Sequence, residues 1–244
     1  SIHVGLQRHF THGPAVRYKQ MPTRKLARVS LSLCALVTAL SAACVFLLLP
    51  AAWTQRRRKL ATPPGIATID DAVAASRATD LAGWPLVTFA QVLVYDNFRA
   101  YSCRNLWDTP AGAFHRGMGY CTQYNLALKQ IFDRLGIASE AVFSLHVRVA
   151  DRPDWTMGHT WLRVTIDGDE RTVCAGRAGN LPGSVHFTPL APVRRGRLPV
   201  LLVAHLGMIL FCGYLEWRAV LTGQPLPAWM FVPRSDVSLP HIRP

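Results

Sequence analysis

The chain has 244 residues, half of them hydrophobic, and a formal charge of +13 because 27 Lys and Arg residues outnumber 14 Asp and Glu residues. This length predicts one core domain with additional segments. The basic excess suits nucleic acid or an anionic membrane surface. However, the sequence has no zinc-finger spacing, no RNA-binding aromatic signature and no Lys-rich tail, so we expect no nucleic-acid partner. The arginines cluster beside apolar segments, which indicates membrane lipid as a partner.

Three of the six cysteines lie within long apolar runs, which leaves Cys103, Cys121 and Cys174 for the rest of the chain. An odd number without regular spacing argues against a disulfide framework. The sequence leaves open a single bridge between Cys103 and Cys174.

The first 28 residues mix His, Arg, Gly and Pro without a period, and we predict that residues 1–28 form a disordered basic arm. Residues 29–55 contain no charged residue and are flanked by basic residues on both sides. A run of this length can cross a hydrocarbon core of about 30 Å. A cleaved signal peptide usually has an apolar region of about 7–15 residues, so we predict a transmembrane helix over 29–55, followed by a basic linker over 56–68.

After the linker, we predict a domain over residues 69–197. Helices are expected over Ile69–Leu81, which carries acidic residues in its first turn, and over Leu86–Tyr101. Residues Ser102–Arg116 are expected to form a loop.

The most informative stretch follows this loop. Gly117 and Gly119 precede Cys121 and allow the backbone to turn sharply and approach its neighbours closely. Apolar residues at spacings of three and four then predict an amphipathic helix that ends near Leu135. A thiol at the first turn of a helix lies at the positive end of the helix dipole, which favours the nucleophilic thiolate. Cys121 is therefore a candidate nucleophile.

A candidate base lies downstream. Residues Ala141–Val149 alternate as a strand, residues 151–157 are expected to form a loop, and His159 then begins a second alternating segment. The Asp167–Gly168 pair predicts a hairpin turn into a third strand, which ends near Cys174. This order places an imidazole beside a helix-terminal thiol, an arrangement used in Cys–His catalysis.

These two blocks, GMGYCTQYNLALKQIFDRLGI and GHTWLRVTIDGDERTVC, resemble the transglutaminase-like (papain-like) cysteine enzymes of the membrane-anchored bacterial type. The resemblance covers roughly Val87–Ala175. It implies an α+β fold in which Cys121 opens a helix packed on an antiparallel sheet that carries His159. It implies a cysteine peptidase or amidase that transfers an acyl group from an amide bond to Cys121, with hydrolysis favoured over transamidation. The substrate would be a peptide, a protein or another amide, and no cofactor is expected.

Cys174 occupies the third catalytic position, where the resemblance implies an aspartate. A carboxylate there would orient His159 and stabilise its cation, whereas a thiol does this poorly. The chain is then a slow enzyme, uses Asp167 or Asp169 instead, or has become a binding or scaffold domain without catalysis. Zinc could also be bound by Cys121, His159 and Cys174, but their spacing is not that of a zinc motif, so we predict no metal.

Near the C-terminus, residues 198–215 contain no Lys, Arg, Asp or Glu. We predict a second hydrophobic helix over 198–217 and favour a membrane span, with a buried or interfacial helix as the competing interpretation. Residues 218–244 are expected to form an irregular Pro-rich tail. Basic residues flank both apolar segments in similar numbers, so the side of the membrane that holds the domain is not determined.

Overall fold

The structure is a computed structural model that describes residues 34–46, 65–150 and 152–234. The predicted arm over 1–28 lies outside the described residues, as does most of the predicted linker over 56–68. Within the predicted span over 29–55, the structure has an exposed apolar helix, Cys34–Phe46, and the ends of that span lie outside the described residues. The remaining described residues form a mixed α+β domain.

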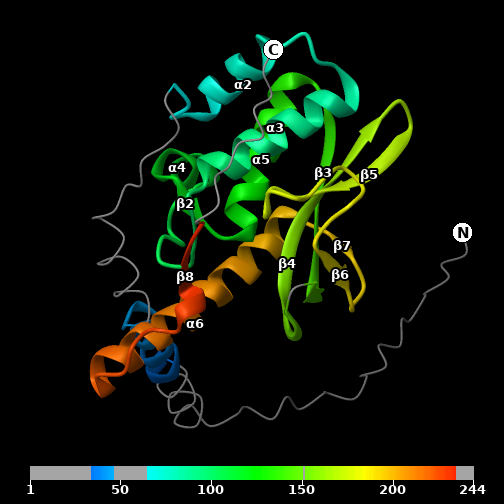
Figure 1. Cartoon of the computed structure of the whole chain (residues 1–244). Coiled ribbons are helices and arrows are strands. Elements are labelled where there is room, and N and C mark those ends of the chain that lie inside the picture. Colours follow the sequence, from blue (N-terminus) through cyan, green and yellow to red (C-terminus); the bar gives the residue numbers. More distant parts are fainter. Residues whose placement is uncertain (1–33, 47–64, 151, 235–244) are drawn as a thin grey trace, which may run out of the picture. The chain divides into compact units, whose positions relative to one another are not determined.

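Helix α5 (Cys121–Leu135) lies at the centre of the domain. Its predicted apolar face is confirmed, since Leu128, Ile131 and Phe132 are fully buried. As Figure 1 shows, α3 (Gly83–Asn97) lies on one side of α5, and strands β3 and β4 lie on the other. The layers are therefore helix, central helix and sheet, and the start of α5 is positioned by both neighbours.

The helix predicted from Ile69 is α2 (Ile69–Arg77), which ends four residues earlier than expected. Its start is fixed by a reciprocal cap, because the backbone N–H of Asp71 donates to Thr68 Oγ1 at 3.1 Å and Thr68 N–H donates to Asp71 Oδ2 at 2.8 Å. Helix α2 packs on α5 and α3.

The main sheet has strand order β5-β4-β3-β6, and β7 also pairs with β3. Its strands are antiparallel: β3 (Ala138–Val149), β4 (Arg152–Ile166), β5 (Asp169–Val173), β6 (Phe187–Pro189) and β7 (Arg194–Arg195).

The predicted hairpin between β4 and β5 is confirmed. Asp167 and Gly168 have φ values of 50° and 82°, the left-handed conformation that a two-residue turn with primed geometry requires. The loop expected over 151–157 is wrong, because pairing between β3 and β4 continues to Val149 opposite Arg152. His159 consequently lies inside a long strand, opposite Ser144, and not at its beginning.

The region predicted as one helix followed by a loop also differs from expectation. Helix α3 ends at Asn97, and Tyr101 belongs to β1 (Ala100–Ser102), which pairs with β2 (Met118–Gly119). The expected loop contains α4 (Pro110–Arg116).

The start of α4 has a local explanation that the loop prediction overlooked. Thr109 Oγ1 accepts a hydrogen bond from Gly112 N–H at 3.1 Å, and proline occupies the first helical position. Both are signals of a helix N-terminus.

The expected irregular tail includes ordered structure. A short 3-10 helix, η2 (Ala228–Met230), leads into β8 (Phe231–Pro233), which pairs antiparallel with β1 and completes the small sheet β2-β1-β8. A chain segment more than a hundred residues downstream thus supports the segment that precedes Cys121.

The second predicted hydrophobic helix is α6 (Leu198–Thr222), which extends five residues beyond the predicted end. Among the described residues, the helical segment Pro199–Thr222 is long and apolar enough to cross a membrane. One face of α6 is buried against the domain through Leu201, Ile209 and Cys212. In Figure 1, α6 runs beneath the start of α5 and beside β4.

Candidate active site

The approach to Cys121 depends on the two glycines singled out in the sequence, each for a different reason. Gly117 ends α4 with φ of 71°, a left-handed conformation that glycine adopts without strain. At Gly119, an added Cβ would lie 2.9 Å from both Gln123 Oε1 and Phe98 Cε1. The backbone before Cys121 therefore has room for no side chain at position 119.

Gln123 holds the first turn of α5 in place. Its Oε1 accepts a hydrogen bond from Tyr120 N–H at 3.2 Å, and its Nε2 donates to the carbonyl oxygens of Asn105 and Asp108, each at 2.9 Å. These bonds connect the helix start to the loop before α4. Cys121 is consequently presented by a turn with a fixed position.

Asn125, one turn after Cys121, joins α5 to the two segments that carry the other candidate residues, strand β4 and the stretch directly after β5. Its Nδ2 donates to Thr160 O at 2.7 Å and lies 3.6 Å from Cys174 Sγ, while its Oδ1 accepts from Ala175 N–H at 3.0 Å. Asn125 is fully buried. The side chain therefore sets the spacing between the helix and the sheet at the site.

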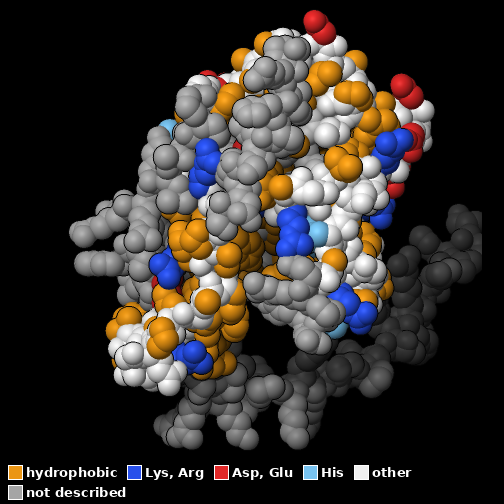
Figure 2. Space-filling model, viewed as in Figure 1, with side chains coloured by type: hydrophobic (Ala, Val, Ile, Leu, Met, Phe, Trp, Pro, Cys, Tyr) orange, Lys and Arg blue, Asp and Glu red, His pale blue; other side chains and the backbone are white. Residues whose placement is uncertain are grey.

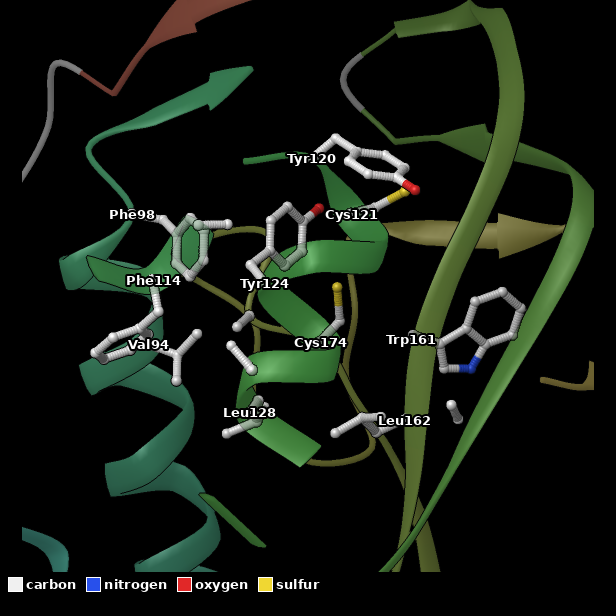
Figure 3. Close-up of a cluster of buried hydrophobic side chains, with 14 of the residues drawn as sticks. Val94, Phe98, Phe114, Tyr120, Cys121, Tyr124, Leu128, Trp161, Leu162 and Cys174 are labelled. Atoms are coloured by element: carbon white, nitrogen blue, oxygen red, sulfur yellow. The ribbon is translucent and has the colours of Figure 1, made fainter. Parts of the chain in front are cut away.

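His159 and Cys174 are in direct contact. His159 Nε2 lies 3.4 Å from Cys174 Sγ, and both side chains are buried. The imidazole also packs edge-on against Phe187, with 4.5 Å between ring centroids. Figure 3 shows Cys121 at the first turn of α5 and Cys174 beside a later turn of the same helix. The third predicted position is thus next to the imidazole, as the chain order suggested.

Cys121 and His159 line the same two cavities. The larger cavity has a volume of about 480 Å³ and is closed on one side by α6, through residues that include Leu201, His205 and Met208. The smaller one measures about 200 Å³ and is lined by Arg177 and His186 among others. The thiol and the imidazole therefore lie between an apolar space and a more polar one.

Burial determines the protonation states of the pair. It raises the pKa of Cys121 to about 11, against hydrogen bonds from the backbone at Thr160 and Thr122 that lower it. Burial also lowers the pKa of His159 to about 3, with a smaller contribution from His186. Both groups are neutral near pH 7. The expected thiolate at the helix start is therefore not the resting form, because desolvation outweighs the helix N-terminus.

The same reasoning applies to the third position. Burial raises the pKa of Cys174 to about 12, so this thiol carries no negative charge that could stabilise an imidazolium at neutral pH. The two nearby aspartates do not take its place. Asp167 and Asp169 are exposed at the hairpin turn, at the far end of the β4–β5 ladder from Cys174.

Neither a Cys103–Cys174 bridge nor a zinc site finds support in the described part of the chain. Its cysteines are free, and Cys103 and Cys174 contact different partners, Tyr101 and His159 respectively. No group of three or more His, Cys, Asp or Glu side chains among these residues is placed to hold a metal ion.

Sequence reasoning missed three residues that shape the site. Asn125 lies within the stretch around Cys121, and its i+4 spacing from Cys121 was the available signal. Tyr120 and His205 gave no signal: the Tyr120 hydroxyl and His205 Nδ1 are 2.6 Å apart, yet 85 positions separate them in the sequence. That hydrogen bond links α6 to the residue before Cys121.

Comparison with known proteins yields limited similarity. No protein-family model matches the chain, and no curated protein matches it. Among solved structures, the chain is similar to one described as "Crystal structure of a TGase", with 16% identity and a TM-score of 0.37. The match covers 46% of this chain and 31% of that chain, so it spans about a third of the length of that structure.

Proposed function

We propose that the protein is a membrane-associated, transglutaminase-like cysteine enzyme that cleaves amide or ester bonds by acyl transfer to Cys121. One observation carries this proposal: the thiol at the start of a buried helix and the imidazole on the adjacent strand line a common cavity, and the imidazole contacts a third side chain, Cys174, directly after β5. A nucleophile, a base and a group that orients the base are the parts that covalent acyl transfer needs.

In this mechanism His159 acts as the general base. Its Nε2 contacts Cys174, and in this proposal Nδ1 receives the proton of the Cys121 thiol. Because both groups are neutral at rest, the proton moves as Sγ attacks the carbonyl carbon, without a preformed ion pair. The backbone N–H of Cys121, one of the first N–H groups of α5 without an intrahelical partner, is suited to bind the developing oxyanion.

The leaving amine or alcohol takes the proton from His159 as the bond to the carbonyl carbon breaks. Water then attacks the thioester, transfers one proton through His159 back to Sγ, and releases the carboxylic acid. An amine in place of water would give transamidation, but the proposal favours hydrolysis because the reaction then needs only water as the second substrate.

A second candidate function is a binding or scaffold domain without catalysis. Cys174 favours it, because a neutral thiol beside His159 Nε2 stabilises the imidazolium poorly. In a domain of this kind the cavity binds a ligand and no thioester forms.

The experiment that tests the proposal detects the covalent intermediate directly. Detergent-solubilised full-length protein is mixed with nitrophenyl esters and amides, and the Cys121 peptide is examined by mass spectrometry. The proposed mechanism predicts a transient acyl adduct on Cys121 in the wild type and no adduct in Cys121→Ala. Release of nitrophenol that persists in Cys121→Ala, with no adduct, would refute it.

Substitution at the third position separates the two candidates. Cys174→Asp places a carboxylate beside His159, which favours the imidazolium and hence the thiolate; Cys174→Ser is the matched control without a charge. If the natural chain is a slow enzyme, the wild type hydrolyses the substrate at a measurable rate and Cys174→Asp hydrolyses it faster. Turnover seen only in Cys174→Asp would identify the natural chain as the scaffold.

Membrane association in this proposal is supported by α6. Its buried residues lie between Leu201 and Glu216 and form one face, which packs on the domain. Its opposite face exposes apolar side chains, including Val203 at 70% and Leu221 at 75%. A helix covered by a domain on one face and apolar on the other suits a membrane interface.

Flotation with lipid vesicles tests this placement. The wild type should float with the vesicles, and Val203→Asp with Leu221→Asp should reduce the floating fraction. The matched control is Thr165→Asp, at an exposed position of β4 outside α6. Equal flotation of all three proteins would contradict the placement of α6.

A further inference from the structure

We infer, on the basis of the function proposed above, that the substrate is an amphipathic lipid: a fatty acyl chain joined through an amide or ester to a polar head. The acyl chain occupies the larger cavity beside α6, the carbonyl lies at Cys121, and the head lies in the smaller cavity.

The larger cavity has the chemistry of an acyl-chain site. None of the residues that line it is Asp, Glu, Lys or Arg, and its wall includes Phe143 and Met157 from the sheet and Met208 and Phe211 from α6. Its volume of about 480 Å³ lies within the range of small-molecule sites. Ser144 and His205 also line the cavity, but a peptide segment here would place many of its backbone N–H and C=O groups against apolar side chains, which is unfavourable without partners. A hydrocarbon chain has no such groups.

The helix that forms this wall also provides access to lipid. Met208 and Phe211 of α6 face the cavity, while Leu202 and Val203 on the same helix are exposed at 51% and 70%. Figure 2 shows many hydrophobic side chains in the region of α6 and along the hollow beside it, together with some basic and polar side chains. The exposed apolar side chains of α6 therefore offer an acyl chain a path from a membrane toward the cavity.

Basic residues lie where this route would meet lipid head groups. Arg194, Arg195 and Arg197 directly precede α6 and are exposed; Arg195 also forms an ion pair with Glu140, with 3.0 Å between Nε and Oε1. Arginines beside an apolar helix attract anionic lipids near a charged membrane surface. The membrane surface is therefore the expected source of the substrate.

The smaller cavity gives the substrate its orientation. It shares Cys121 and His159 with the larger one but also holds Arg177 and His186. A polar or anionic head is favoured there, so the bond that breaks joins the acyl carbonyl to the head. His159 protonates the departing head, the chain remains on Cys121 as a thioester, and water releases it as a fatty acid with the proton returned to the thiol.

Gly207 allows the cavity to be filled without disturbing the fold. It lines the cavity from α6, and an added Cβ would meet nothing within 4 Å. Leucine is also a better helix former than glycine, so Gly207→Leu should keep α6 intact. The matched control is Gly179→Leu, since Gly179 also has open space around its Cβ but lies outside both cavities.

The binding test uses Cys121→Ala protein in lipid vesicles that contain a fatty acid with a photoreactive group on its chain. After illumination, peptides are mapped by mass spectrometry. Crosslinks are expected on Phe143 and Met157, reduced at least fivefold by Gly207→Leu and unchanged by Gly179→Leu. Crosslinks confined to the outer face of α6, or unaffected by Gly207→Leu, would overturn the inference.

A turnover test in the wild-type background keeps this inference separate from the proposed function. Nitrophenyl dodecanoate should be hydrolysed at least tenfold faster than nitrophenyl acetate, and Gly207→Leu should remove that preference. Crosslinks at Phe143 without any acyl adduct on Cys121 would support lipid binding and refute acyl transfer to Cys121. Hydrolysis of nitrophenyl acetate but not of the dodecanoate, without crosslinks, would support acyl transfer to Cys121 and refute a lipid substrate.

Discussion

The helices α5 and α6 border the same cavity, yet they are held in place by different forces. Buried polar side chains anchor α5: Gln123 is bonded to the loop before α4, and Asn125 is bonded to β4 and to the turn after β5. Helix α6 packs mostly through apolar side chains, with Glu216 as its buried charged residue, and Tyr120–His205 is its hydrogen bond to the start of α5. Hydrogen bonds are directional and apolar packing is not. The side of the cavity that would carry out chemistry is therefore specified more tightly than the side that would admit substrate.

The largest effect is expected from removing the anchor of α5. Asn125→Ala leaves the buried Thr160 carbonyl and the Ala175 N–H without their partner. Since each orphaned buried group costs roughly 1–3 kcal/mol, we expect a loss of about 4 kcal/mol in the free energy of unfolding by urea.

The control for this variant is Lys129→Ala on the exposed side of the same helix, where the ion pair with Asp133 is removed. An exposed i,i+4 pair contributes about 0.3–0.5 kcal/mol. Similar losses in the two variants would show that Asn125 does not anchor the helix.

The reactivity of Cys121 tests how tightly α5 is held compared with α6, because the thiol is buried only while α5 keeps its position. With a pKa raised to about 11, the thiolate fraction increases tenfold per pH unit below that value. Iodoacetamide labelling of Cys121 should therefore rise roughly thousandfold between about pH 7 and pH 10.

Site-resolved mass spectrometry separates Cys121 from the other cysteines, and glutathione provides a reference thiol that labels fully at lower pH. A labelling rate at Cys121 that is already maximal near pH 7 would show an activated thiolate and contradict the buried, neutral thiol.

His159 makes the strand beside α5 sensitive to acid. Its pKa is lowered to about 3 in the folded protein, against 6.5 for an ordinary histidine. The unfolded chain therefore binds a proton that the folded protein does not, and stability falls as the pH decreases from about 6.5 toward 3. Between about pH 7 and pH 4, this contribution amounts to about 3 kcal/mol.

Unfolding by urea at the two pH values measures that loss. It should be about 3 kcal/mol smaller in His159→Gln than in wild type, whereas His115→Gln, at an exposed histidine, should retain the wild-type loss. An unchanged pH dependence in His159→Gln would contradict burial of a neutral imidazole.

The smallest effect is expected at the junction of the two helices. Tyr120→Phe removes the hydrogen bond to His205, at a cost of about 1 kcal/mol. Hydrogen exchange should become faster in α6 and remain unchanged in α5. Tyr214→Phe, on the exposed face of α6, is the control. Faster exchange in both helices after Tyr120→Phe would show that they are held as one unit.

Local signals in the sequence predicted much of the domain. The apolar spacing after Cys121 predicted α5, and Asp167–Gly168 predicted the β4–β5 turn. These succeed because helix periodicity and left-handed turns depend on residues close together in the chain. The loop expected before His159 failed for the opposite reason, since pairing with β3 extends β4 through residues with no strand signal of their own.

For the candidate site, the sequence likewise predicted which residues lie close together but not their protonation states. The order of Cys121, His159 and Cys174 along the chain was sufficient to predict that Cys174 lies near the imidazole. It was not sufficient to predict their protonation, because a pKa depends on how much water the surrounding fold removes. The helix dipole that the sequence suggested is a local effect, and burial of the thiol outweighs it.

What the sequence by itself determined is therefore the chemical inventory: a thiol opening an amphipathic helix, an imidazole on a strand, and a thiol where the resemblance implies a carboxylate. Only the tertiary structure decided how these groups are surrounded. It placed α6 across the cavity, brought β8 back to support β1, and buried His159 and Cys121 as neutral groups. The physical reason is that residue types and short spacings are local, whereas desolvation and cavity walls come from segments distant in sequence.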